Sequence, residues 1–148
     1  MGHVGSQPRS AEHAVQVDSR LALAVVVCFQ NEAEHLPTLL QSIDAQTEPA
    51  DQVVLVDDGS DDKSPSIVAA YERSRCEVRV VTRERRSAER DRLADAPELR
   101  AFAAGVAALD RPWDAVAKID GDLELSPTLF ADVRARFRAD PALGITGS

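Results

Sequence analysis

Short runs of apolar, often β-branched residues alternate along this chain with segments that have the apolar spacing of helices. A short continuous apolar run is typical of a strand buried on both faces. Strands that alternate with helices form a mostly parallel sheet flanked by helices. The sequence therefore predicts an α/β fold, with strands over residues 21–29, 52–56, 77–82 and 114–119 and the start of another at Gly144–Thr146.

Helix start signals follow three of these strands. The first helix is either capped by Asn31, with Glu34 three positions on, or begins near His35, because Pro37 fits only a first turn. Further helices are expected from Ser64–Pro65, over residues 97–109, and from Ser126–Pro127, the last with an apolar face of Leu129, Phe130, Val133 and Phe137.

The length of 148 residues fits one domain. Residues 1–20 are polar and without a period, which predicts a disordered leader before a domain over residues 21–148. The longest apolar run, 21–29, is too short to span a bilayer and lacks the features of a signal peptide. Cys28 and Cys76 make no disulfide framework and are expected as reduced thiols of a cytoplasmic protein.

The net charge of −8 argues against a nucleic-acid-binding protein, which usually shows a basic surface. The carboxylates are either a solvated acidic surface or, in part, grouped to hold a divalent cation. Residues 83–95 mix Arg, Glu and Asp without an apolar period. This segment is either a solvated loop or a basic loop near a phosphate.

Polar clusters follow the first, second and fourth strands, at residues 30–32, 57–62 and 120–122. In open α/β sheets, ligands bind outside the carboxyl ends of the strands. If the strands are parallel, the three clusters meet at one edge of the sheet. We therefore expect the functional site there.

Two of these clusters have a specific chemistry. The carboxylates of Asp120 and Asp122, with Gly121 between them, suit magnesium or manganese, which prefer hard oxygen ligands and substrate phosphates. An aspartate at the end of the second strand can accept hydrogen bonds from a nucleobase or a ribose, and Gly59 permits a sharp turn. Both clusters could instead be plain acidic turns, the second one capping the next helix.

In this order, Val25–Glu32, Val54–Ser60 and Lys118–Asp122 resemble successive signatures of family 2 glycosyltransferases, which have the Rossmann-like GT-A fold. The resemblance extends from residue 21 to residue 148. It implies transfer of a hexose, with inversion, from a nucleoside diphosphate sugar such as a UDP-sugar, in polysaccharide or cell-envelope glycan synthesis. It also implies a divalent metal cofactor, Mn²⁺ or Mg²⁺.

The resemblance implies roles for individual residues. Asp58 would bond the base, Asp57 would support its loop, Asp122 would ligate the metal, and Asp120 would face the ribose or assist the metal. The remaining nucleotide-sugar-binding residues would be Phe29, Asn31, Glu32, Gly59 and Arg100. The chain departs from the family at Cys28 and Gln30, where the family often has proline and an aromatic residue.

In the family, the catalytic base lies in the acceptor half, well downstream of the metal motif. We therefore expect it beyond Ser148, so the domain here would be truncated and unable by itself to transfer sugar to a saccharide or lipid-linked acceptor. The resemblance implies a cytoplasmic protein, at the inner face of a membrane in many relatives. Two alternatives are a receiver-like signalling domain that binds magnesium and a catalytically inactive nucleotide-binding α/β domain.

Overall fold

The computed structural model describes residues 20–71, 77–84 and 96–147. Residues 1–19 of the expected leader, Cys76, and the greater part of the expected loop 83–95 lie outside the described residues. Among the described helices, none is long and apolar enough to cross a membrane.

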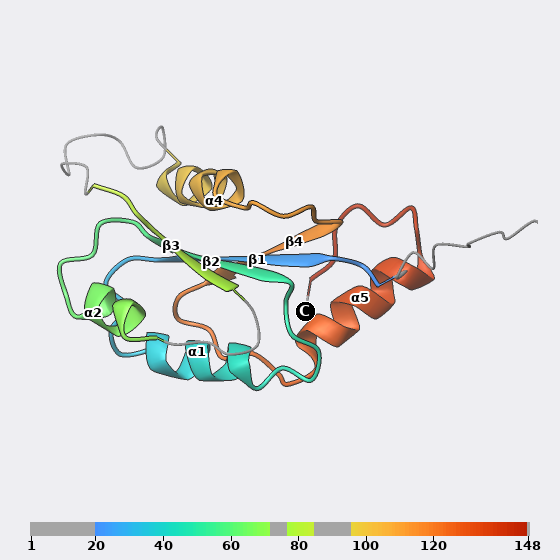
Figure 1. The fold of residues 1–148 in the computed structure, drawn as a ribbon, viewed down its shortest axis with the longest axis horizontal. Coiled ribbons are helices and arrows are strands. Elements are labelled where there is room, and N and C mark those ends of the chain that lie inside the picture. Colours follow the sequence, from blue (N-terminus) through green and yellow to red (C-terminus); the bar gives the residue numbers. More distant parts are fainter. Residues whose placement is uncertain (1–19, 72–76, 85–95, 148) are drawn as a thin grey trace, which may run out of the picture.

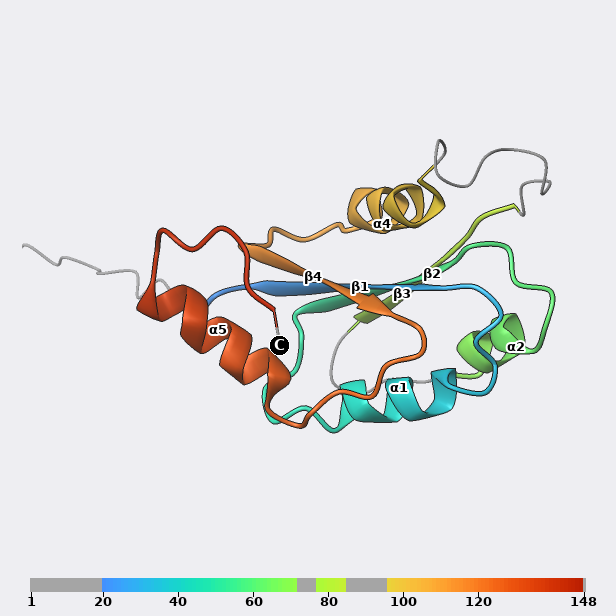
Figure 2. The same cartoon turned by 180° about the vertical axis from the view of Figure 1, so that it is seen from behind.

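The structure confirms the predicted α/β fold with a parallel sheet (Figure 1). All strand pairs run parallel, and the strand order is β3-β2-β1-β4. Helices α1, α2 and α5 cover one face of the sheet, and α4 covers the other, as the reverse view in Figure 2 also shows. The elements are β1 (Leu23–Phe29), α1 (Leu36–Asp44), β2 (Gln52–Asp57), α2 (Ser64–Ala69), β3 (Glu77–Thr82), α4 (Pro97–Ala107), β4 (Ala115–Asp120) and α5 (Leu129–Ala139).

The core lies on both faces of β1, the strand between β2 and β4. Successive side chains of a strand point to opposite faces. Leu23, Val25, Val27 and Phe29 therefore pack on the face of α1 and α5, and Val26 packs on the face of α4. A central strand without polar side chains is the arrangement that the continuous apolar run predicted.

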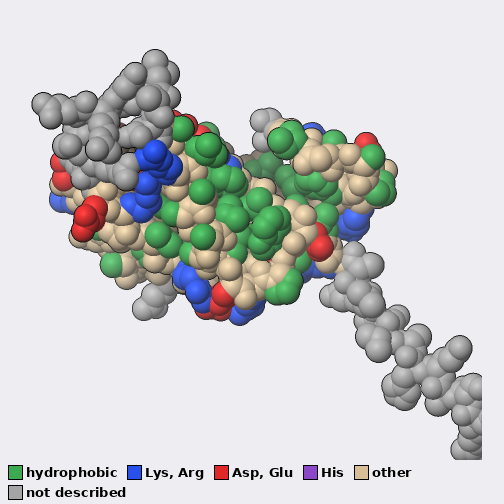
Figure 3. Space-filling model, turned by 90° about the horizontal axis from the view of Figure 1, so that it is seen from above, with side chains coloured by type: hydrophobic (Ala, Val, Ile, Leu, Met, Phe, Trp, Pro, Cys, Tyr) green, Lys and Arg blue, Asp and Glu red, His purple; other side chains and the backbone are tan. Residues whose placement is uncertain are grey.

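Helix α4 lies close to the sheet at Gly105. A Cβ atom on Gly105 would be 2.3 Å from Val26 Cγ1 and 2.9 Å from Val56 Cγ2. No side chain fits between the helix and the sheet at this point, which explains the small residues in this helix. Of the described helices, only α4 lies on this face, and Figure 3 shows hydrophobic side chains gathered on the side of the molecule that carries it.

Several predicted element boundaries were wrong. Asn31 does not cap a helix: it has a φ of 59°, and α1 begins after His35, as the alternative with Pro37 in the first turn predicted. Ser64 is the first residue of α2 rather than its cap, and α5 begins only at Leu129. No strand forms over Gly144–Thr146, where Ile145 is 88% exposed.

The expected apolar face of α5 is confirmed, with Phe130 fully buried and Leu129, Val133 and Phe137 packed against the core. The same helix also buries an arginine, Arg134, whose side chain is 0% exposed. Its guanidinium donates to the carbonyl oxygens of Leu21 (3.0 Å) and Pro49 (2.9 Å) and pairs with Asp51 (2.9 Å). The group thus ties α5 to the loops at the beginning of β1 and β2.

Candidate functional site

The three polar clusters meet at one edge of the sheet, as predicted. Phe29 at the end of β1 lies beside Asp57 at the end of β2, and Asp57 lies beside Thr82 of β3. On the other side of β1, Asp120 at the end of β4 lies beside Cys28. The parallel register therefore places the loops that follow these strands next to one another.

Hydrogen bonds fasten the loop after β1 to the loop after β2. The side chain of Asn31 accepts a bond from the N–H of Asp61 at 2.9 Å, which fixes the left-handed backbone that asparagine tolerates. Consecutive backbone N–H groups also donate across: Asn31 to Ser60 Oγ (2.9 Å), Glu32 to Ser64 Oγ (2.9 Å) and Ala33 to Asp62 Oδ2 (3.0 Å). Asn31 therefore holds the shape of the edge through its side chain and its backbone, and Glu32 does so through its backbone.

Asp57 organises the turn after β2 from within. Its side chain is buried, and its Oδ1 accepts the N–H of Ser60 at 2.8 Å. Gly59 has a φ of 79°, in the left-handed region where a side chain would be strained. The turn after β2 is therefore fixed by a buried carboxylate and a glycine, and it presents the next carboxylate, Asp58, at the surface.

Asp58 is held from several sides. Its N–H donates to the carbonyl oxygen of Phe29 at 2.9 Å, and its own carbonyl accepts the side chain of Gln30 at 2.8 Å. Its carboxylate pairs with the guanidinium of Arg83, and both side chains are about one fifth exposed, 22% and 21%. The backbone N–H of Arg83 donates to Asp57 O at 2.8 Å, which continues the β2–β3 ladder.

Sequence reasoning did not single out Arg83. It is the first residue of segment 83–95, for which the sequence predicts either a solvated loop or a basic loop near a phosphate. Its position directly after a strand, beside the end of β2, was the available signal. Parallel pairing of β2 and β3 carries Arg83 to the same edge as Asp58.

The acidic turn after β4 lies directly on the end of β1. The N–H of Gly121 donates to Cys28 O at 3.0 Å. A Cβ atom on Gly121 would be 2.5 Å from Phe29 Cβ and 3.1 Å from Glu32 Cγ. Gly121 therefore lets two backbone segments approach closely and leaves Asp120 and Asp122, both exposed, on either side of it.

The two aspartates of this turn differ in their contacts. The carboxylate of Asp120 pairs with the ammonium of Lys118, and this hydrogen bond raises the pKa of Lys118. The carboxylate of Asp122 makes no hydrogen bond or ion pair with the residues that the structure describes. Nearby, Glu32 accepts a hydrogen bond from His35 Nδ1 at 2.9 Å, which raises the pKa of His35.

Cys28 lies between the two ion pairs. Its thiol is half-buried, and burial raises its pKa to about 11; the charges of Asp120 and Asp58 also raise this pKa, whereas those of Lys118 and Arg83 lower it. Burial therefore favours the protonated thiol over the thiolate at neutral pH. These charges also show that both ion pairs lie within electrostatic reach of one strand end.

Two further predicted site residues, Phe29 and Arg100, lie outside the three turns at the strand ends. The ring of Phe29 is 4% exposed and belongs to the hydrophobic core, so it supports the edge from beneath. Arg100 is exposed in the second turn of α4. The N-terminal end of α4 lies at the same end of the sheet (Figure 1), and the charge of Glu98 in its first turn acts on Lys118.

The acidic turn fits a divalent cation in its donor chemistry. No group of three or more His, Cys, Asp and Glu side chains in the described part of the chain could hold a metal by itself. Magnesium and manganese sites commonly have one or two carboxylates, completed by water and substrate phosphates. Asp120 and Asp122 have this donor chemistry; the carboxylate of Asp120 is paired with the ammonium of Lys118.

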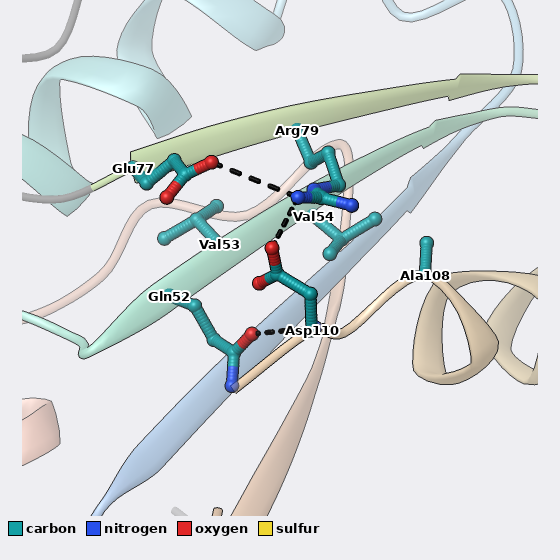
Figure 4. Close-up of a pocket in the computed structure, with 7 residues that line it drawn as sticks. All are labelled: Gln52, Val53, Val54, Glu77, Arg79, Ala108 and Asp110. Carbon is teal, nitrogen blue, oxygen red and sulfur yellow. Dashed lines mark hydrogen bonds and ion pairs between the residues drawn. The ribbon is translucent and has the colours of Figure 1, made fainter. Parts of the chain in front are cut away.

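A hollow at the opposite end of the strands does not compete with this edge. Gln52, Glu77, Arg79 and Asp110 line it, and ion pairs of Arg79 with Glu77 and Asp110 cross it (Figure 4). Its volume of about 10 Å³ holds at most one water molecule. We therefore assign no ligand to it.

Replacing Gly121 by alanine should destabilise the protein by about 1–3 kcal/mol, because the new methyl group would overlap Phe29 and force the backbone of the acidic turn to move. Chemical denaturation of the variant measures this loss. Gly144→Ala is the matched control, since nothing lies within 4 Å of the added Cβ atom. Equal stability of the two variants would show that the close contact at Gly121 is absent in solution.

The chain is similar to known proteins in sequence and in fold. Residues 24–96 match the family model described as glycosyl transferase family 2. No curated protein sequence matches the chain. The fold is similar to that of S. aureus TarS, with 24% identity and a TM-score of 0.60 over 80% of this chain and 20% of that one.

Crystal structures of S. aureus TarS 1–349 in complex with UDP and with UDP-GlcNAc are also similar. Each has 22% identity and a TM-score of 0.62 over 86% of this chain, which spans 39% and 38% of those chains, respectively. The chain therefore spans much less than half of these solved proteins. The likeness confirms the predicted GT-A, Rossmann-like fold.

Proposed function

Because residues 24–96 of this chain belong to glycosyl transferase family 2, we propose that it binds a nucleoside diphosphate sugar at the carboxyl edge of its sheet. The observation that carries the proposal is the meeting of the Asn31–Glu32, Asp57–Gly59 and Asp120–Asp122 turns at that edge. The reaction would be the inverting transfer of a hexose. Asp57, Asn31, Glu32 and Gly59 would shape the pocket, with Phe29 beneath it.

For the nucleobase, we propose that Asp58 accepts a hydrogen bond from its ring N–H and that Arg83 donates to the neighbouring carbonyl oxygen of the same ring. Oδ1 of Asp58 bonds to Arg83, and Oδ2 has no bond to the described residues. The pair thus offers an acceptor beside guanidinium donors. Uracil has one ring N–H between two carbonyl oxygens, so it matches the pair whichever side Arg83 occupies. This symmetry, together with the fold shared with UDP-bound TarS, favours UDP.

For the diphosphate, we propose that Asp122 is the main ligand of Mn²⁺ or Mg²⁺ and that Asp120 faces the ribose or assists the metal. A bound divalent ion would neutralise the diphosphate as it leaves. Arg100, exposed near the start of α4, would add positive charge on the nucleotide side. No described residue is assigned as the catalytic base that inverting transfer requires.

For the acceptor, we propose a saccharide or a lipid-linked saccharide, in the synthesis of a polysaccharide or a cell-envelope glycan, at the cytoplasmic face of a membrane. These proposals follow from the family alone.

The receiver-like alternative has less support, because doubly wound sheets of that class have the strand order 2-1-3-4-5, whereas this sheet has the order β3-β2-β1-β4.

UDP should raise the melting temperature of the 148-residue chain only when Mn²⁺ or Mg²⁺ is present. At a ligand concentration one hundred times Kd, binding stabilises the folded state by about 2.7 kcal/mol, which corresponds to roughly 5–10 °C for a domain of this size. Differential scanning fluorimetry with UDP, GDP, CDP and ADP, with metal or with EDTA, measures the shift. If no nucleoside diphosphate stabilises the protein, the proposed function is wrong, and phosphate uptake from acetyl phosphate would favour the receiver-like alternative.

A further inference from the structure

Lys118 lies on β4, and the strand places its cationic side chain beside the acidic turn. It precedes Asp120 by two residues on β4, and residues two apart on a strand point to the same face. Its ammonium pairs with the Asp120 carboxylate. In the register of the sheet, Lys118 lies beside Val26 and Asp120 beside Cys28, so the ammonium reaches toward the edge where the three turns meet.

The pair has two consequences for ligands. A divalent ion that approaches Asp120 has to displace the ammonium, so Lys118 disfavours metal binding in the absence of nucleotide. Once displaced, the ammonium has three donors without a carboxylate partner. A diphosphate held by the same turn would offer it acceptors, since phosphate oxygens accept charge-assisted hydrogen bonds.

We propose that Lys118 couples the binding of the divalent metal to the binding of the nucleoside diphosphate, by holding Asp120 before ligands arrive and moving to the diphosphate when the metal takes Asp120. The inference rests on the proposed function and makes Lys118 a positioning residue for the donor. By thermodynamic reciprocity, nucleotide must strengthen metal binding by the same factor by which metal strengthens nucleotide binding.

The expected effects differ in size and in sign. The side chains of Lys118 and Asp120 are 34% and 57% exposed, so their ion pair is weak, and its removal should tighten metal binding by a few-fold at most. A charge-assisted contact to phosphate is stronger, and its loss should weaken UDP binding by about tenfold or more. Lys118→Met therefore moves the two affinities in opposite directions.

The test compares the 148-residue chain with its Lys118→Met variant in two titrations. Electron paramagnetic resonance measures the Kd of Mn²⁺ alone, and calorimetry measures the Kd of UDP at saturating Mn²⁺. The expected result is a lower Kd for Mn²⁺ and a higher Kd for UDP. A general structural role of Lys118 would instead weaken both.

Controls separate the possible outcomes. Arg138→Met removes one positive charge from an exposed position of α5 and should change neither Kd. Lys118→Arg keeps a cation and should restore UDP affinity at least in part. If the unmodified chain binds no UDP, both the proposed function and the inference fall. If it binds UDP with metal but Lys118→Met changes neither Kd, or changes both in one direction, the inference alone is overturned.

Discussion

Replacing Asp122 by alanine should abolish the stabilisation of this protein by UDP and Mn²⁺ while leaving its fold intact. The side chain is exposed, and it makes no hydrogen bond or ion pair with the described residues, so its loss should change the stability of the free protein by no more than about 0.5 kcal/mol. Its carboxylate is the proposed main metal ligand. Without it, the metal would lose its strongest anchor, and the diphosphate would lose the metal.

The measurement is the melting temperature with UDP and Mn²⁺ together, compared with that of the free variant. Glu124→Ala is the matched control, because it removes the same charge from an exposed position two residues farther along the chain. The control should keep the full shift of roughly 5–10 °C, whereas Asp122→Ala should show none. A shift of equal size in both variants would remove Asp122 from the metal site.

Replacing Arg134 by methionine should destabilise the protein by about 3 kcal/mol. Breaking a buried ion pair by removing one partner commonly costs about 3–5 kcal/mol. Here Asp51 and Glu48 remain 31% and 40% exposed, so water compensates their charges in part and we expect the lower end. The carbonyl oxygens of Leu21 and Pro49 would also lose their donor.

Urea denaturation followed by circular dichroism measures this effect. Arg138→Met lies one helical turn farther along α5, at an exposed position, and should change stability by no more than about 0.5 kcal/mol. The contrast separates the buried guanidinium network from any general effect of charge on the helix. A loss below about 1 kcal/mol in Arg134→Met would mean that methionine packing compensates for the network.

The sequence predicted the elements of this fold well because the buried strands are nearly free of polar side chains. β1 and β2 can be recognised in the sequence as continuous apolar runs. Their alternation with helices allows only a few sheet topologies. The predictions were wrong where local signals compete. Asn31 is a residue type that often caps helices, but its side chain accepts a hydrogen bond from the neighbouring loop. The helix begins only at Leu36, with Pro37 in its first turn.

The candidate site was predictable only as a set of strand ends. That Asp57, Asp58, Asp120 and Asp122 gather at one edge could be predicted because parallel strands bring their carboxyl ends together. The contacts of each residue could not, because they depend on burial and on partners in other parts of the fold. The buried turn-forming role of Asp57 is visible only in the folded chain, and so is the core position of Phe29.

By itself, the sequence determined the parallel α/β sheet and the edge at which its acidic turns gather, since hydrophobic periodicity and strand ends are local properties. The tertiary structure decided which cations accompany Asp58 and Asp51. Arg83 reaches Asp58 through the pairing of β2 with β3, and Arg134 reaches Asp51 across 83 positions of the chain. Such partners are chosen by packing in three dimensions, and no spacing in the sequence records them.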